Sequence, residues 1–351
     1  MNGFIAAFLI AVFVTPYVGI IARKAHFVDD PKKRYHPAQV HSGIIPRAGG
    51  VGIYIAFLCV VLLWLPVSKI ITGILLAATI VVLVGIWDDY KDLSPYFRLF
   101  MNVVVAGLVV GFGVGVPFIT NPLGGIIPLD TWTIHFTLFG EHSLLVWADL
   151  FAVVWIVWMM NTIGWSAGVD GQLPGFVVIA SIVIALLSQR FAAHDIEQTV
   201  VAQLAFVNAG AFMGFLVWNF YPQKIMPGYG GKSLAGFILA VLSILSSAKV
   251  GTALLVLGVP MIDAFYTLIR RMLSRKSPFR ADRGHLHHHL LDLGWGKRRI
   301  ALFYWGISAL LGLIALNFTS QGKLFVFVLL GVLLGMILLA LRLFRFFRVL
   351  P

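Results

Sequence analysis

The chain has 351 residues, of which 60% are hydrophobic and only 11% are charged, and its formal net charge is +12. Soluble globular proteins carry about 25% charged residues, so this composition excludes a soluble or disordered chain and indicates a polytopic membrane protein. The single cysteine, Cys59, excludes an internal disulfide. The positive charge suits anionic lipids and phosphate-bearing substrates, and we expect no nucleic-acid partner.

Apolar runs that can cross a bilayer recur along the chain. A transmembrane helix needs about 20 apolar residues, and this criterion predicts eleven spans in one integral-membrane domain, residues 1–351. The predicted spans are 3–22, 49–66, 68–87, 98–118, 146–163, 173–189, 198–219, 233–248, 250–269, 300–317 and 324–341. Between the fourth and fifth spans, alternating apolar and polar residues around Ile127 to Phe139 predict a short extracytoplasmic β-hairpin. The expected fold class is therefore an all-α polytopic membrane protein with loops that carry an active site.

Basic residues fall unequally between the loops. Almost all of the 26 lysines and arginines follow odd-numbered spans or lie in the C-terminal tail, so the positive-inside rule places these segments in the cytoplasm and the N-terminus outside the inner membrane. The aspartate and histidine clusters lie in the same loops, which favours an enzyme working at one membrane surface. A transporter would place charged groups near mid-bilayer, where Asp263 is the main candidate.

The first cytoplasmic loop ends in Pro46-Arg47-Ala48-Gly49-Gly50. Its basic residues can bind phosphate, although positive-inside bias explains them equally well. At the end of the third span, Asp88, Asp89 and Asp92 lie within five residues, and Asp88 and Asp92 share one face of a continuing helix. Carboxylates this close raise one another's pKa unless a cation lies among them. The natural cation is Mg²⁺, which prefers oxygen ligands; a solvated helix end is the alternative.

The third and fourth cytoplasmic loops carry isolated polar residues. Asn161 ends an apolar helix, where its amide needs a partner, and Asp170 between small residues has the exposure that a metal ligand or base needs. In the fourth loop, the glycines around Gly228 let backbone N–H groups approach phosphate, and Lys232-Ser233 opens a helix whose N-terminus favours anions. A simple turn is an equally open interpretation of either loop.

The fifth cytoplasmic loop is rich in histidine. His285, His287, His288 and His289 fall within five residues, after Asp282-Arg283. No cysteine or glutamate accompanies them at the spacing usual for zinc. Together with Arg283 they suit a diphosphate, which they can bind through charge-assisted hydrogen bonds.

With these five loops the chain resembles the polyprenyl-phosphate N-acetylhexosamine-1-phosphate transferase family, glycosyltransferase family 4. The stretch Asp88 to Asp92 is similar to the family's DDxxD, and residues 282–288 are similar to its HxHH segment. Residues 41–50 are similar to its HxxxxPRxGG. The Asp-Arg before the histidines is closer to the branch that uses UDP-N-acetylglucosamine.

The chain departs from the family pattern at three positions. In the third loop, where the family has NxxNxxDGxDG, Gly164 replaces an Asn and Ala167 replaces an Asp. The matching positions of that loop are Asn161, Gly168, Asp170 and Gly171. In the fourth loop, Tyr229 replaces an Asp that is a metal ligand in relatives. The metal-binding residues therefore cannot be carried over intact.

The resemblance implies transfer of a sugar 1-phosphate from a UDP-sugar to polyprenyl (undecaprenyl) phosphate, with release of UMP. The similarity to the branch that uses UDP-N-acetylglucosamine implies that the transferred group is N-acetylglucosamine 1-phosphate. This would be the first membrane step of a cell-envelope glycan such as lipopolysaccharide or teichoic acid, and a homodimer stays open. It implies Mg²⁺, or Mn²⁺, held by Asp89, Asp92 and Asp170. The implied catalytic residues are Asp88, Asp89, Asp92, Asp170 and His287. The implied substrate-binding residues are Arg47, Asn161, Lys232, Arg283, His285 and His288. Because of the three departures from the family pattern, an alternative function stays open: a catalytically altered or inactive relative that acts as a membrane scaffold or nucleotide-sugar binder.

Overall fold

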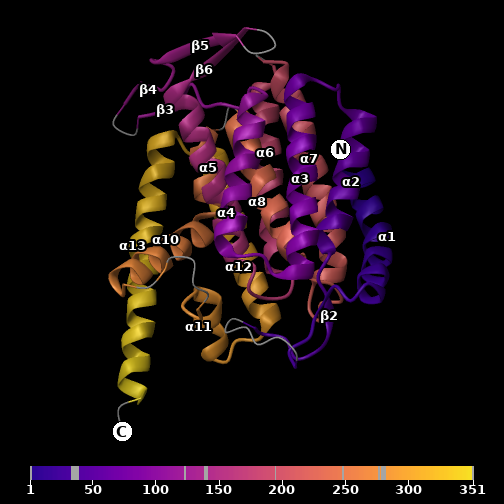
Figure 1. Ribbon diagram of the computed structural model, residues 1–351. Helices are drawn as coiled ribbons and strands as arrows, with labels where there is room; N and C mark the ends of the chain where they lie inside the picture. The colour runs from indigo at the N-terminus through magenta and orange to yellow at the C-terminus, as the bar shows by residue number, and fades with distance from the viewer. Residues whose placement is uncertain are drawn as a thin grey trace.

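The computed structural model describes residues 2–32, 39–121, 124–137, 141–193, 195–246, 249–275, 277 and 282–349. Within them, long helices run side by side and short strand pairs lie at the ends (Figure 1). The helices are α1 Asn2–Lys24, α2 Gly49–Trp64, α3 Lys69–Lys91, α4 Pro95–Gly111, α5 Val146–Trp165, α6 Gln172–Phe191, α7 Glu197–Asn219, α8 Gly228–Leu245, α9 Lys249–Val256, α10 Gly258–Leu273, α11 Leu286–Asp292, α12 Lys297–Asn317 and α13 Ser320–Val349. The strands are β1 Val28–Asp29, β2 Ile45–Pro46, β3 Phe118–Thr120, β4 Ile126–Pro128, β5 Thr133–Thr137 and β6 Glu141–Leu145.

Among the described residues, eight helices are long and apolar enough to cross a membrane, or nine if α9 and α10 count as one bent span. Each predicted span coincides at least in part with a helix, but the count of eleven is not confirmed. Helices α2 and α4 have only 16 and 17 residues. The predicted span 250–269 is broken, because α9 and α10 meet at 85°. Gly258 begins α10 and Pro260 lies in its first turn, where a proline without an N–H is tolerated.

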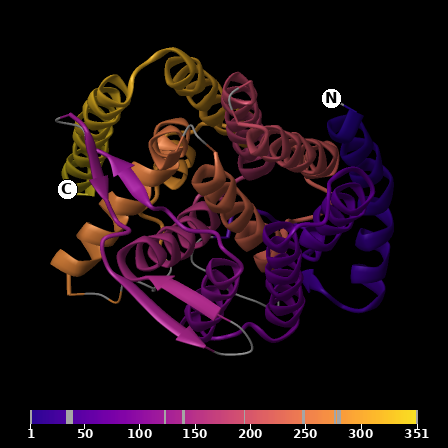
Figure 2. The same cartoon turned by 90° about the horizontal axis from the view of Figure 1, so that it is seen from above.

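Helix α8 lies at the centre of the bundle, where it packs against α3 and α5, while α7 packs against α1 and α6 (Figure 2). Near the start of α8 the backbones of three helices touch. A Cβ atom added to Gly85 would overlap the backbone of Gly230, and one added to Gly50 would overlap that of Gly231. Small residues allow such close approach of helices in lipid. Helices α2, α3 and α8 are therefore held together at this glycine junction.

The segment between α4 and α5 forms two antiparallel strand pairs instead of one hairpin over 127–139. Strand β3 pairs with β4 (Phe118 opposite Pro128), and β5 pairs with β6 (Thr133 opposite Leu145). Both pairs cover the end of the bundle that lies away from β2 and α11 (Figure 1).

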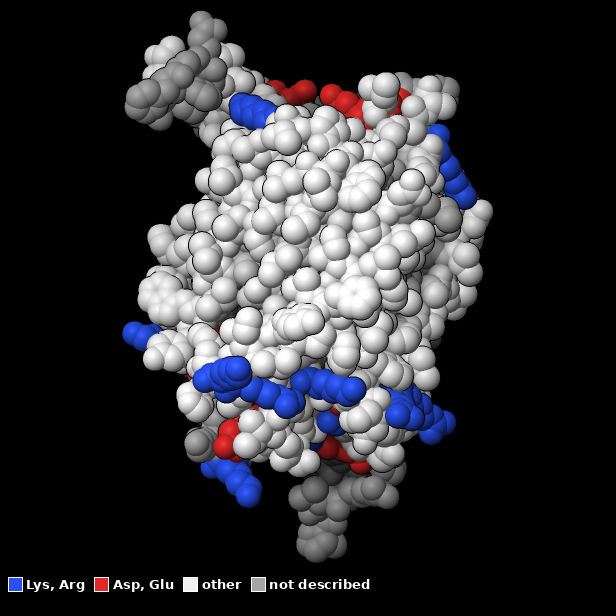
Figure 3. Space-filling model, turned by 90° about the vertical axis from the view of Figure 1, so that its right-hand side faces the viewer, with Lys and Arg blue, Asp and Glu red and all other residues white. Residues whose placement is uncertain are grey.

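The two ends of the bundle differ in charge. On the face shown in Figure 3, lysine and arginine side chains form a band near one end, and uncharged side chains fill the region between the ends. Helix α1 begins in the half of the bundle that is nearer the paired strands, and α13 ends beyond the opposite end (Figure 1). That the termini lie on opposite sides of the membrane, with the C-terminus in the cytoplasm, stays a prediction.

Candidate active site

A cavity of about 360 Å³ lies at the end of the bundle where β2 and α11 are found. Its walls come from the first loop, α3, α4, α5 with the loop that follows it, α8 and the histidine segment. Seven of the eleven predicted site residues line it: Arg47, Asp88, Asn161, Lys232, His285, His287 and His288. The other four, Asp89, Asp92, Asp170 and Arg283, are not among its lining residues. Segments far apart in the sequence thus meet around one space.

Two arginines compensate the aspartates at the end of α3. Asp88 Oδ1 lies 2.6 Å from Arg98 Nε, and Asp89 Oδ1 lies 3.2 Å from Arg47 Nη2. The backbone N–H of Tyr229 also donates to Asp89 Oδ1, at 3.1 Å. The sequence reasoning missed Arg98, because one arginine in the first turn of a helix is indistinguishable from positive-inside bias. Its only signal was its position one turn after the aspartates.

Asp92 does not continue the face of Asp88. Helix α3 ends at Lys91, and Asp92 follows in the left-handed region with a φ of 48°. Its side chain is 45% exposed and accepts a hydrogen bond from Arg47 Nη1 at 3.3 Å. The assumption of a continuing helix was therefore wrong, and Asp92 closes the helix end instead of lining the cavity.

The third loop places its two polar residues in different surroundings. Asn161 lines the cavity, and its amide donates to Val157 O of its own helix at 2.8 Å. The side chain of Asp170 is only 3% exposed, so the expectation of an exposed carboxylate was wrong. Its Oδ1 lies 3.2 Å from Lys297 Nζ and its Oδ2 accepts from the N–H of Gln223 at 3.2 Å. Asp170 therefore ties this loop to α12 and to the α7–α8 loop.

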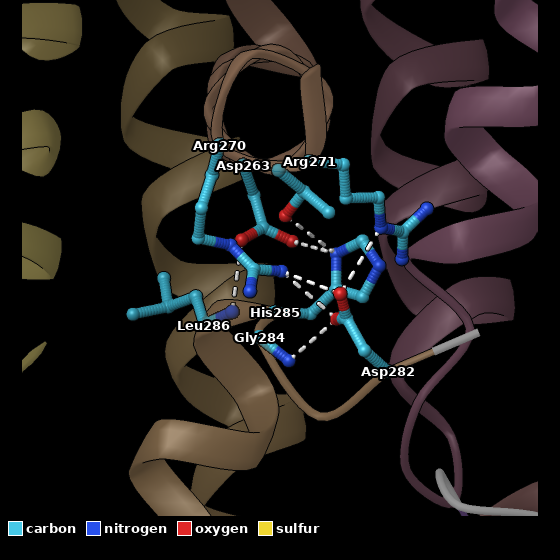
Figure 4. Close-up of polar contacts among 8 residues, drawn as sticks. Asp263, Arg270, Arg271, Asp282, Gly284, His285 and Leu286 are labelled. Atoms are coloured by element: carbon cyan, nitrogen blue, oxygen red, sulfur yellow. Dashed lines mark hydrogen bonds and ion pairs between the residues drawn. The ribbon is translucent and has the colours of Figure 1, made fainter. Parts of the chain in front are cut away.

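The histidine segment is anchored on α10 (Figure 4). Asp263 Oδ2 lies 2.8 Å from His285 Nδ1, and its Oδ1 accepts from the N–H of Leu286 at 2.8 Å. Asp263 was the candidate for a mid-membrane transport group, and the structure shows that it holds His285. About two turns further along α10, Arg270 and Arg271 bind Asp282 at the start of the segment.

The lowered pKa of Asp282 reflects the donors that bind it at the start of the histidine segment. Burial alone would raise that pKa, but Arg271, the N–H of Gly284 and Arg270 outweigh burial and hold it well below its usual range. Asp282 is therefore ionised at neutral pH.

His287 and His288 lie in the first turn of α11 and are buried. Burial and the neighbouring His288 hold the pKa of His287 well below its usual range. Burial and the positive charge of Arg283 lower the pKa of His288 to about 4. Both imidazoles are therefore neutral near pH 7. The Nδ1 atom of each has no hydrogen-bond partner in the described part of the chain.

The position of His287 depends on a glycine of the third loop. A Cβ atom added to Gly168 would overlap the imidazole of His287. Arg283 lies at the outer edge of the segment, where its Nη2 is 3.2 Å from Asp292 Oδ1.

The aspartates expected to hold Mg²⁺ or Mn²⁺ do not form one ligand set. Within the described residues, no group of three or more His, Cys, Asp or Glu side chains is placed to hold a metal ion. Asp89 and Asp92 contact Arg47, and Asp170 contacts Lys297. Since each carboxylate already faces a cationic side chain, these residues in this arrangement do not fit the ion, and the metal assignment stays a prediction.

The chain is similar to known proteins along most of its length. A model of glycosyl transferase family 4 matches residues 71–247. The probable undecaprenyl-phosphate N-acetylglucosaminyl 1-phosphate transferase of Bacillus subtilis (strain 168) is 30% identical over 321 residues, which are 88% of this chain and 83% of that protein. The decaprenyl-phosphate N-acetylglucosaminephosphotransferase of Mycobacterium leprae is 29% identical, over 86% of this chain and 79% of its own. The undecaprenyl-phosphate alpha-N-acetylglucosaminyl 1-phosphate transferase of Thermotoga maritima is 27% identical, over 91% and 90%.

Proposed function

This chain belongs to glycosyl transferase family 4, and we propose that it transfers N-acetylglucosamine 1-phosphate from UDP-N-acetylglucosamine to a polyprenyl phosphate and releases UMP. The observation that carries the proposal is the single cavity in which aspartate, arginine, lysine and histidine side chains from separate loops meet at one end of an apolar bundle. A phosphate on a membrane lipid and a water-soluble nucleotide can both reach such a place. By the positive-inside rule this end faces the cytoplasm.

The proposed reaction is a displacement at phosphorus. An oxygen of the lipid phosphate forms a bond to the β-phosphorus of the UDP-sugar. The bond from that phosphorus to the bridging oxygen breaks, and UMP leaves with the electron pair. The lipid phosphate is already largely ionised near neutral pH, because its second pKa is about 6. The protein therefore needs to supply position and compensating charge more than a strong base.

The cavity walls supply these two needs. The neutral imidazoles of His287 and His288 each carry one N–H that can be donated to a phosphate oxygen. Arg47 and Lys232 bring positive charge to the diphosphate. Asp88 Oδ2 is buried without a hydrogen-bond partner among the described residues. It is therefore the oxygen that can accept the remaining proton of a singly ionised lipid phosphate.

The test uses purified protein with undecaprenyl phosphate and UDP-N-acetylglucosamine, with and without Mg²⁺, and measures UMP release. Release should require both substrates, and Asp89→Asn and His287→Ala should each abolish it. Omission of the lipid is the control for simple hydrolysis. A panel of UDP-sugars in the same assay identifies the sugar. Unchanged release in both variants would remove the site assignment.

A second candidate is a relative that binds the nucleotide-sugar without turning it over. The separation of Asp170 from Asp89, together with Tyr229 in the fourth loop, favours it. This candidate predicts saturable binding of UDP-N-acetylglucosamine and no UMP release under any ionic condition. The release assay therefore separates the two candidates.

A further inference from the structure

The cavity contains a lysine whose ammonium contacts no carboxylate of the described chain, although Asp89 and Asp29 act on it from a longer distance. Lys232 lies in the second turn of α8, and its side chain lines the cavity. Within the described residues its ammonium forms no hydrogen bond and no ion pair within 4.0 Å. An ammonium held in a protein wall without a countercharge is unfavourable. The position therefore suits an anionic ligand.

The other strong cations of the cavity are already occupied. Arg47 faces Asp89, Arg98 faces Asp88 and Arg271 faces Asp282, all at 3.2 Å or less. A ligand that used these arginines alone would compete with the carboxylates that hold them. Lys232 differs, because no carboxylate of the described chain contacts its ammonium and a ligand would therefore displace none.

Lys232 also lies between the two walls that a diphosphate would touch. Its charge acts on both Asp89 and His287. A Cβ atom added to Gly164 in the last turn of α5 would lie 4.0 Å from Lys232 Cβ, which is ordinary contact distance. The lysine therefore packs beside the end of α5, where the third loop begins.

The neighbouring Tyr229 turns to the wall formed by α4. Its hydroxyl donates to Asn102 Oδ1 at 3.1 Å, and the guanidinium of Arg98 lies 5.1 Å from the centre of its ring. Tyr229 thereby supports the arginine that pairs with Asp88. The first turns of α8 thus offer the cavity an ammonium and no carboxylate.

We propose that Lys232 supplies the positive charge that neutralises the diphosphate of the UDP-sugar, so that binding of the nucleotide does not depend on a divalent ion. This inference rests on the proposed function for the identity of the ligand. Lysine binds phosphate as a compact point charge, and a fixed ammonium needs no carboxylate ligands to hold it in place.

The experiment measures binding of UDP-N-acetylglucosamine by isothermal titration calorimetry. Protein freed of metal with EDTA, and checked by elemental analysis, is compared with protein in excess Mg²⁺. The dissociation constants should agree closely. Lys232→Met should weaken binding in EDTA by about tenfold or more, since hydrogen bonds to charged groups contribute about that much. Lys232→Arg should retain most of the affinity, and the loss in Lys232→Met should be smaller for UMP.

Lys224→Met is the matched control, because Lys224 lies in the loop just before α8, over the ring of Trp218, and is exposed. Its binding should match that of the unaltered protein. If Lys232→Met does not fold, thermal unfolding of the unaltered protein decides: UDP-N-acetylglucosamine should raise the melting temperature in EDTA. Binding that appears only with Mg²⁺, or unchanged binding in Lys232→Met, would overturn the inference. Either result would leave the proposed transfer standing, because UMP release is measured in a separate assay.

Discussion

Two walls of the cavity hold their polar groups in opposite ways. On the aspartate wall, made by Arg47, Asp88 and Arg98 with Asp89 behind it, carboxyl and guanidinium groups are paired across elements. On the histidine wall, made by Asp263, His285, His287 and His288, the two innermost imidazoles are neutral and have an unpartnered ring nitrogen. Among the described residues, most of the charged atoms on the first wall already have partners and Asp88 Oδ2 is the exception, whereas the second wall keeps a free ring nitrogen on each of two histidines. The difference predicts that changes to the first wall reduce stability as well as activity, and that changes to the second reduce mainly activity.

The largest effect is expected from Arg98→Met. The Asp88 side chain is 1% exposed and would keep the N–H of Leu93, at 3.1 Å, and one cation of the described chain, Arg47, at 3.9 Å. Removal of one partner from a buried ion pair costs about 3–5 kcal/mol, and we expect the lower end because the Arg98 side chain is 29% exposed. Thermal unfolding of the detergent-purified protein measures the loss. The double variant Asp88→Asn/Arg98→Met should recover much of it, and an equal loss in both variants would contradict the pairing.

Gly168→Ala tests the histidine wall. The added methyl group would overlap the His287 ring and displace it. A shift of about 1 Å in a positioned group can reduce the rate about 100-fold, so UMP release should fall by about that factor while the melting temperature changes little. Gly164→Ala is the control from the end of α5, four residues earlier, since its methyl group meets only Lys232 Cβ at 4.0 Å among the described residues. Equal rates in the two variants would show that the position of His287 is unimportant.

Asp263→Asn should have a smaller effect on the same wall. The amide oxygen can still accept from the N–H of Leu286, but the negative charge beside His285 is lost. Hydrogen bonds to charged groups contribute about 1.5–3 kcal/mol, so the rate of UMP release should fall about tenfold. Asp263→Ala leaves both partners unsatisfied and should lose more. A rate for Asp263→Asn equal to that of the unaltered protein would show that the carboxylate does not position His285.

The smallest effect is the pH dependence that His288 adds to stability. Its pKa is about 4 in the folded chain and about 6.5 in an unfolded one. Between these values the unfolded chain binds a proton that the folded chain does not, so stability falls as pH decreases from about 6.5 to about 4. Melting temperatures across this range should fall less steeply in His288→Asn. Identical slopes would show that His288 is not held neutral. Asp282, whose pKa is lowered, contributes to the pH dependence of stability only at more acidic pH.

The sequence predicted the parts of the site that depend on local pattern. Hydropathy placed a helix at each predicted span, and the clustered aspartates and histidines identified Asp88 and His287, which do line the cavity. The ends of elements were less predictable. Asp92 adopts a left-handed conformation with no glycine to signal it, so the end of α3 was missed.

Long-range partners could not be predicted at all. The pairing of Asp263 with His285 joins residues 22 positions apart, and that of Asp170 with Lys297 joins residues 127 positions apart. No periodicity or spacing encodes such contacts, because they arise only when distant helices pack. For the same reason Arg98 and Lys297 were counted as membrane-orientation charges.

The glycine junction beneath the cavity has a consequence for inhibition. Here α3 and α8 touch through backbone atoms at Gly85 and Gly230, so the helices that carry Asp88 and Lys232 meet without side-chain rotamers that could reorganise. An inhibitor that contacts both Asp88 and Lys232 would therefore lose little affinity to ordering of these helices. Resistance through substitution of Gly85 is also closed off, because a Cβ atom there would overlap the backbone of Gly230.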